Sequence, residues 1–134
     1  MTLWWAHRYD APIHAHVSEQ PAEVENCRRV YGKTLTEHLA QYGVLDRLAT
    51  AVHATHLTPD DVGELSTRNT FACFCTTTEA DLADGIGLAI ELVDQSVLLT
   101  VGTDSQAVID ILGEARWRTS EHRSARWRWT RRNA

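Results

Sequence analysis

Cysteine and long apolar runs are both scarce in this sequence of 134 residues. It has three cysteines, an odd number, and two of them alternate with phenylalanine within residues 71–75, so a secreted disulfide framework is not expected. No apolar run reaches the ~18 residues of a membrane span. The N-terminus lacks the basic start and apolar core of a secretory signal. We therefore expect a cytoplasmic protein without a membrane partner.

Basic residues are few before residue 115 and frequent after it. Residues 1–114 contain six Lys and Arg against 17 Asp and Glu, whereas residues 115–134 contain seven Arg against one Glu. The acidic body argues against nucleic-acid binding, which only the Arg- and Trp-rich tail could support. We interpret residues 118–134 as a divergent tail, helical or disordered, and do not expect nucleic acid as a partner.

Apolar strands and helices are predicted to alternate along the chain. Strands are expected at residues 12–17, 50–54, 70–75 and 97–101. Helices are expected at 21–32, at 34–42, from Thr58 onward, at 86–94 and from about Gln106, with a polar turn after residue 75. Because Thr58 is followed by Pro59 and two acids, that helix has a strong start. Buried strands separated by helices indicate an α/β fold with a parallel sheet.

Polar residues follow each predicted strand, and parallel sheets bind ligands at this carboxyl edge. The candidates are His16 to Glu19, His53 and His56, Thr76 to Glu79, and Asp104 with Ser105. His and Asp ligate metals, and Glu transfers protons beside them. Each motif also has an ordinary explanation: a surface His–Glu pair, a buried strand histidine beside a solvated one, or an Asp that caps a helix.

The order His, His, Asp along one edge resembles the amidohydrolase superfamily of metal-dependent (β/α)8 TIM barrels. Within it, the chain is most similar to the formimidoylglutamate deiminase family. The similar stretches are 14–25, 52–58, 75–86 and 102–105, and the resemblance spans about residues 12–117. It implies that residues 1–117 form a partial amidohydrolase barrel, the C-terminal half with about strands 5–8.

The resemblance also implies roles for individual residues. His16 and Asp104 would be ligands of one zinc ion, and Asp104 would also take a proton from its water. Glu19 would be the proton shuttle. His53 would have a catalytic role and would also bind the substrate, together with Ser105. The implied reaction, in histidine degradation, is hydrolysis of N-formimino-L-glutamate to N-formyl-L-glutamate and ammonia. Zinc lowers the pKa of its bound water from 15.7 to about 7.

The sequence departs from the family pattern in three places. The family's His-x-His ligand pair on the first barrel strand is missing, because His14-Ala15-His16 continues with Ser-Glu, as the later strand does. Thr76 replaces a Pro, and Gln106 replaces a His. Two expected ligands are too few for a catalytic zinc site. We therefore predict a truncated barrel with little or no deiminase activity as an isolated chain.

Three alternatives stay open at this point. The chain would suit another amidohydrolase deaminase that acts on a purine or related ring, or a non-catalytic remnant or binding module. Since a half-barrel has an unpaired sheet edge and a large apolar surface, a separate N-terminal half-barrel or self-association would complete it.

Overall fold

The structure, a computed structural model, describes residues 2–104 and 109–116 of the chain. Its helices are α1 (Thr2–Tyr9), α2 (Pro21–Tyr31), α3 (Leu35–Gln41), α4 (Pro59–Thr67), α5 (Thr76–Asp81) and α6 (Ala89–Asp94). Its strands are β1 (Ile13–Val17), β2 (Ala49–His53), β3 (Phe71–Phe74) and β4 (Leu99–Val101). Residues 111–116 are also helical. Strands occur at all four predicted places.

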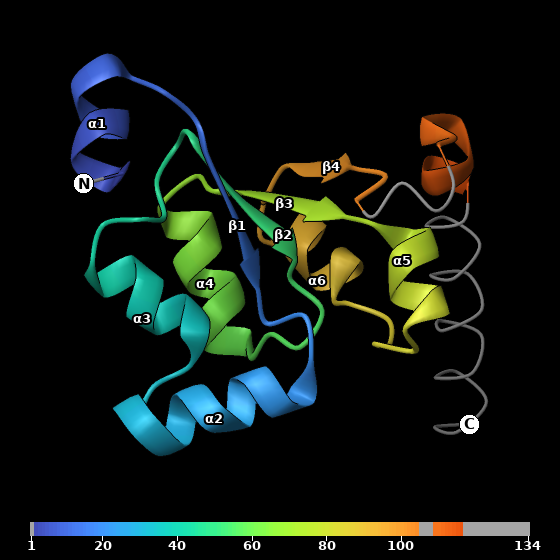
Figure 1. Cartoon of the computed structure of the whole chain (residues 1–134), viewed down its shortest axis with the longest axis horizontal. Helices are drawn as coiled ribbons and strands as arrows, with labels where there is room; N and C mark the ends of the chain where they lie inside the picture. Colours follow the sequence, from blue (N-terminus) through green and yellow to red (C-terminus); the bar gives the residue numbers. More distant parts are fainter. Residues whose placement is uncertain (1, 105–108, 117–134) are drawn as a thin grey trace.

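The four strands form one parallel sheet in the order β1-β2-β3-β4. The register places His16 beside Val52, Val52 beside Cys73, and Cys73 beside Thr100. All four strands therefore run in the same direction and end at one edge (Figure 1). This confirms the predicted α/β fold and brings the predicted polar segments to a common edge.

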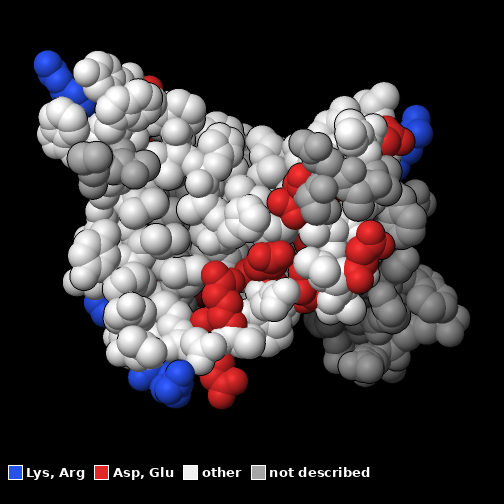
Figure 2. Space-filling model, viewed as in Figure 1, with Lys and Arg blue, Asp and Glu red and all other residues white. Residues whose placement is uncertain are grey.

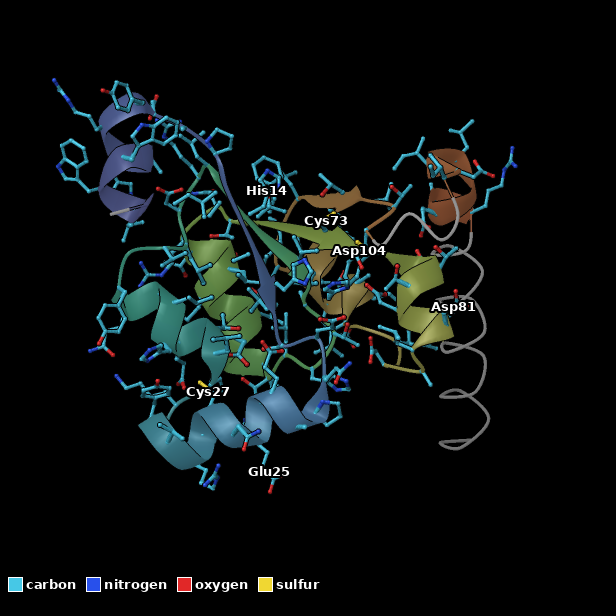
Figure 3. The ribbon with its side chains drawn as sticks, in the orientation of Figure 1. His14, Glu25, Cys27, Cys73, Asp81 and Asp104 are labelled. Carbon is cyan, nitrogen blue, oxygen red and sulfur yellow. The ribbon has the colours of Figure 1, made fainter. Side chains whose placement is uncertain are left out.

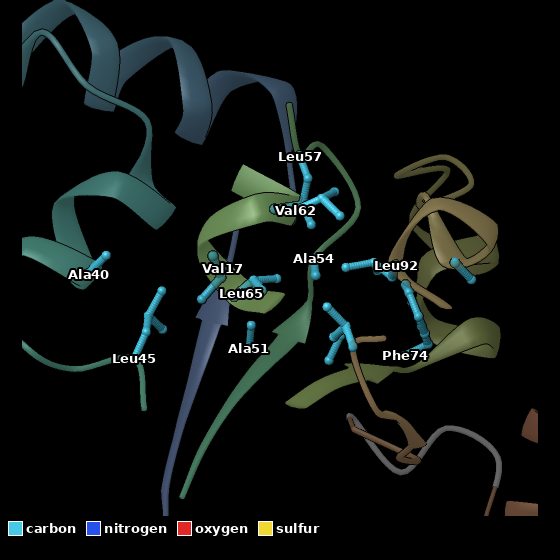
Figure 4. Close-up of a cluster of buried hydrophobic side chains, with 13 residues drawn as sticks. Val17, Ala40, Leu45, Ala51, Ala54, Leu57, Val62, Leu65, Phe74 and Leu92 are labelled. Atoms are coloured by element: carbon cyan, nitrogen blue, oxygen red, sulfur yellow. The ribbon is translucent and has the colours of Figure 1, made fainter. Parts of the chain in front are cut away.

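The core lies between one face of the sheet and helices α3, α4 and α6 (Figures 1 and 4). Val17, Ala51 and Phe74 from the strands pack in the same cluster as Leu65 of α4 and Leu92 of α6. Each large side chain of this kind contributes about 1.5–3 kcal/mol when fully buried. On the opposite face, by contrast, His14 and Thr100 are exposed and Phe71 is half-buried.

Local signals at the helix ends act as the sequence predicts. Thr34 caps α3 and Thr58 caps α4, and both helices have a complete capping box, with Glu37 and Asp61 as the returning acids. Gly32 ends α2 with a φ of 69°, a conformation that glycine adopts without steric cost. The starts of α3 and α4 and the end of α2 are therefore confirmed.

Three helix assignments from the sequence are wrong. Residues 76–81 form helix α5 instead of a polar turn, α6 begins at Ala89 instead of residue 86, and α1 is not predicted. Contacts distant in sequence stabilise α5, because the Thr76 hydroxyl and the Thr77 N–H both donate to Glu114. The predicted tail, residues 118–134, and the replaced Gln106 lie outside the described residues.

Acidic side chains dominate one view of the surface. Figure 2 shows Asp and Glu gathered in a band across this face, with Lys and Arg at its margins. Among the described residues, no helix combines the length and the apolar character needed to cross a membrane. The face shown in Figure 2 therefore agrees with the acidic charge balance of residues 1–114.

Candidate metal and proton-transfer site

Left-handed backbone conformations mark the ends of three strands. Ser18 directly follows β1 with a φ of 52°, His53 ends β2 with a φ of 67°, and Asp104 lies three residues after β4 with a φ of 43°. Non-glycine residues adopt such angles rarely, at a cost of about 1–3 kcal/mol each in sparsely populated regions. At these three residues the chain leaves the extended conformation of a strand, so side chains no longer alternate between the two faces of the sheet. The candidate side chains lie at these points.

His16, Glu19 and Asp104 lie together at this edge. Nδ1 of His16 is 3.7 Å from Oε2 of Glu19, and Nε2 of His16 is 3.8 Å from Oδ1 of Asp104. The His16 ring stands edge-on to the His53 ring, with 4.8 Å between their centroids. The structure thus brings together four predicted site residues, which come from β1, β2 and the segments that follow β1 and β4.

His53 is fully buried between two carboxylates. Its Nε2 is 3.6 Å from Oε1 of Glu19, and its Nδ1 is 3.5 Å from Oε1 of Glu79. Burial alone would lower the pKa of His53, but the Glu79 side chain and the charge of Glu19 outweigh it and raise this pKa above its ordinary value. Neither ring nitrogen has a partner at ordinary hydrogen-bond distance. The ring therefore has nitrogens available to a ligand.

Glu79 is a site residue whose role the sequence does not reveal. It is only 1% exposed, and its Oε1 accepts a hydrogen bond of 2.9 Å from the Cys75 N–H. Its position in the polar stretch Thr76 to Glu79 is the only sequence signal. Its partner His53 lies on another strand, so the pairing depends on the sheet. Glu79 holds the buried imidazole from the side opposite Glu19.

Two free thiols lie next to this group. The hydrogen bond from Cys75 lowers the pKa of Cys73 to about 6, and the same contact, together with burial, raises the pKa of Cys75. Cys75 is buried and Cys73 is half-buried, and both are free, as is Cys27. This agrees with the expectation that the cysteines form no disulfide framework.

Two overlapping sets of side chains have donor atoms close enough to share a metal ion. His16, Glu19 and His53 form one set, and His53, Cys75 and Asp104 form the other. Within each set, one donor atom per residue lies within 4.8 Å of the others. Imidazole, carboxylate and thiolate are all zinc ligands, so the chemistry of the donors fits a zinc ion.

Other polar residues from the sequence prediction have different positions. His56 donates a hydrogen bond of 2.7 Å from Nε2 to the Asp84 carbonyl, which occupies its ring in a loop contact. Thr76 is fully buried and donates to the Glu114 carbonyl, away from the histidines. Ser105, a predicted substrate-binding residue, lies outside the described residues.

Curated proteins similar to this chain are amidohydrolase-type deaminases. Formimidoylglutamate deiminase of Pseudomonas aeruginosa is 34% identical over 108 residues, which are 81% of this chain and 24% of that protein. The 5-methylthioadenosine/S-adenosylhomocysteine deaminase of Aquifex aeolicus is 34% identical over 107 residues, which are 80% of this chain and 25% of that protein. The chain thus spans about a quarter of the length of these relatives.

Solved structures with a similar fold lead to the same family. An amidohydrolase from Brucella melitensis matches with a TM-score of 0.82 and 32% identity, over 87% of this chain and 26% of that one. An adenosine deaminase from Xanthomonas campestris with bound zinc matches with a TM-score of 0.79 and 29% identity, over 85% and 27%. The Amidohydrolase family itself matches residues 3–133. With this fold and this match over nearly its whole length, the chain belongs to the amidohydrolase family.

Proposed function

We propose that this chain provides part of the active site of a metal-dependent deaminase that hydrolyses N-formimino-L-glutamate to N-formyl-L-glutamate and ammonia. The observation on which this rests is that His16, Glu19, His53 and Asp104 meet at one sheet edge. The 34% identity to formimidoylglutamate deiminase supports the choice of substrate. We place the reaction in the cytoplasm, since free thiols suit a reducing compartment.

His16 and Asp104 would hold a single zinc ion in this proposal. Their nearest nitrogen and oxygen are 3.8 Å apart, close to the spacing of two donors that share one zinc. A bound zinc ion supplies Lewis-acid chemistry and makes water acidic enough to ionise near neutral pH. Asp104 would accept a proton at its carboxylate beside that position.

Glu19 and His53 would move and stabilise charge around the reacting carbon. The two carboxylate oxygens of Glu19 lie 3.7 Å from His16 and 3.6 Å from His53, so Glu19 can pass a proton towards the departing nitrogen. His53 would donate a hydrogen bond to the tetrahedral centre. Glu79 fixes the His53 ring from its other side. Ser105 remains a predicted substrate contact.

A purine-type deaminase is the second candidate. The Aquifex 5-methylthioadenosine/S-adenosylhomocysteine deaminase has the same 34% identity as the formimidoylglutamate deiminase. Both reactions replace an amino or imino nitrogen on a carbon atom and release it as ammonia. His16, Glu19, His53 and Asp104 would have the same roles in either reaction. The two candidates differ in the substrate and share the metal and the proton-transfer residues.

A chimera separates the two candidates. The 108-residue segment of the Pseudomonas enzyme that matches this chain is replaced by the corresponding part of this chain. The chimera is assayed for ammonia release from formiminoglutamate and from 5-methylthioadenosine. We expect zinc-dependent activity on formiminoglutamate that falls at least about 100-fold in Glu19→Gln, as loss of a general acid–base residue does.

Asp60→Asn, at an exposed position of α4, is the matched control for the Glu19→Gln chimera. It makes the same carboxylate-to-amide change away from the site and should keep activity. A folded, zinc-loaded chimera that acts only on 5-methylthioadenosine would favour the second candidate. One that acts on neither substrate would contradict the proposed function.

A further inference from the structure

Two sulfur atoms lie side by side at the carboxyl end of β3. A Cβ atom at Gly102 would be 3.2 Å from Sγ of Cys73 and 3.4 Å from Sγ of Cys75, so both sulfurs pack against the same glycine. The two side chains also shift each other's pKa, lowering that of Cys73 and raising that of Cys75. Figure 3 shows Cys73 on β3, well separated from Cys27 on α2.

His53 supplies a nitrogen donor next to these thiols. Its ring is 0% exposed, and neither of its nitrogens has a hydrogen-bond partner at ordinary distance. Donor atoms of His53, Cys75 and Asp104 lie within 4.8 Å of one another. Two ligands of a tetrahedral zinc ion, at about 2.0–2.3 Å each, are about 3.3–3.8 Å apart. Side-chain movements of up to about 1 Å would therefore close the set around an ion.

Glu79 gives His53 the orientation of a metal ligand. Histidines that bind metals commonly direct their second nitrogen to a carboxylate, which fixes the ring. Nδ1 of His53 faces the buried Glu79 carboxylate at 3.5 Å, and Nε2, 3.6 Å from the partly exposed Glu19 carboxylate, is the nitrogen that an ion would take. A purely structural role for His53 would explain its buried carboxylate partner. It would not explain the two thiols next to the ring.

We propose that Cys75, His53 and Asp104, with the Cys73 thiol packed beside Cys75 against Gly102, form a binding site for a thiophilic divalent cation of the zinc and cadmium class. Two sulfur donors favour such soft ions, and two thiolates with one carboxylate more than balance a charge of two. The site differs from the proposed zinc position at His16 and Asp104 and does not depend on the proposed function. Asp104 is a proposed ligand at both positions, so an ion held by the thiols would compete with an ion held by His16 and Asp104.

Cadmium titration of the purified full chain tests the site. With a non-thiol reductant present, Cd²⁺ should produce the ultraviolet charge-transfer absorption of cadmium–thiolate bonds at one equivalent. Cys75→Ser and Cys73→Ser should each reduce this absorption and weaken binding more than about tenfold. Cys27→Ser, which removes a buried thiol on α2, is the matched control and should leave both unchanged.

Two further variants keep the test valid if the Cys75→Ser protein does not fold. Glu79→Gln should weaken Cd²⁺ binding about 10–100-fold with the thiolate absorption retained at saturation, because it replaces the carboxylate that faces His53 and leaves both thiols in place. His16→Gln should retain the thiolate absorption, because His16 belongs to the other donor set. Circular dichroism identifies the folded variants.

Absence of thiolate absorption in the folded native chain would overturn the proposal. So would absorption that persists in Cys73→Ser and Cys75→Ser but disappears in Cys27→Ser. If cadmium binds without thiolate absorption and His16→Gln abolishes binding, the ion occupies the nitrogen and oxygen donors. That result would contradict the thiolate site while agreeing with the proposed function, so the two failures are distinguishable.

Discussion

The Thr34 hydroxyl donates a hydrogen bond of 2.5 Å to Oδ1 of Asp61, which joins the starts of α3 and α4. Asp61 is 0% exposed, and its second oxygen accepts from the N–H and the hydroxyl of Thr58. The side chain of Thr34 also accepts from the Glu37 N–H. Two capping boxes are therefore linked through a single buried carboxylate, which fixes how the two helices pack.

Removal of the Thr34 hydroxyl should destabilise the fold. Thr34→Ala loses a helix cap and leaves a buried carboxylate oxygen without its partner, for an expected cost of about 1–3 kcal/mol in the free energy of unfolding. Urea denaturation of the purified chain measures this cost. Thr34→Ser keeps the hydroxyl and should stay within about 1 kcal/mol of the native chain. Equal loss in both variants would contradict the role given to the Thr34–Asp61 bond.

Gly87 should not tolerate a side chain. A Cβ at this position would lie 2.9 Å from Cε1 of Phe74 and 3.3 Å from the Ala54 carbonyl oxygen. Because Phe74 is a buried core residue, Gly87→Ala should cost about 1–3 kcal/mol through overpacking. Thermal unfolding monitored by circular dichroism would detect this as a lower Tm.

Gly63 is the matched control for Gly87→Ala. It lies inside α4, and a Cβ there would meet no atom within 4 Å. Gly63→Ala should stabilise the chain by about 0.5–1 kcal/mol, because alanine favours a helix over glycine. If both variants shift Tm in the same direction, the contact with Phe74 is not the determining factor.

The stability contributed by His53 should depend on pH. The folded-state pKa of His53 lies above the unfolded value of about 6.5. Its contribution is therefore complete below that unfolded value and is lost as the pH rises through the folded pKa. The free-energy difference between the native chain and His53→Gln should be larger at about pH 6 than at about pH 9. Urea denaturation of both proteins at the two pH values measures it.

Glu79→Gln and His14→Gln refine the pH experiment. Glu79→Gln removes the carboxylate that raises the pKa of His53 most, so it should reduce the pH dependence. His14→Gln changes an exposed histidine of β1 and should leave the pH dependence of stability unchanged. A native chain that gains stability relative to His53→Gln at high pH would contradict the assignment.

The isolated chain should release little or no ammonia from formiminoglutamate, even with zinc. In the proposal the zinc ion has two ligands from the described residues, His16 and Asp104, because Glu19 and His53 have other roles, whereas catalytic zinc sites have three protein ligands and an open position. Ammonia release by the purified chain is compared with that of the chimera at equal zinc. Robust zinc-dependent turnover by the isolated chain, abolished in Glu19→Gln, would contradict this prediction. Activity that appears only in concentrated samples, together with a larger particle by light scattering, would instead support completion of the barrel by self-association.

Local sequence signals predict those parts of the fold that local contacts determine. Thr58-Pro59-Asp60-Asp61 predicts the start of α4 because the cap, the proline and the acids all act within one turn. The meeting of His16 and Asp104 is also predictable, because parallel strands align their carboxyl ends. The strand alternation and the site edge therefore follow from the order of apolar and polar residues.

Contacts between distant segments explain what the sequence does not predict. Helix α5 begins with three threonines, which have modest helix propensity, and its start is secured by Glu79 within the helix and by Glu114 far along the chain. The role of Glu79 depends on His53, which the sheet brings to it. Neither the contact of α5 with Glu114 nor the contact of Glu79 with His53 has a signal in the neighbouring sequence. Each can be identified only from the folded structure.

The sequential strand order has a kinetic consequence for the site. Most of the described chain separates His16 on the first strand from Asp104 beyond the last, so their contact closes a very long loop. Contacts of this kind form late, because their loop-closure entropy must be offset by the pairing of the intervening strands. A spectroscopic probe of the His16–Asp104 distance would therefore report completion of folding, and metal affinity at this edge would appear only in the final folding phase.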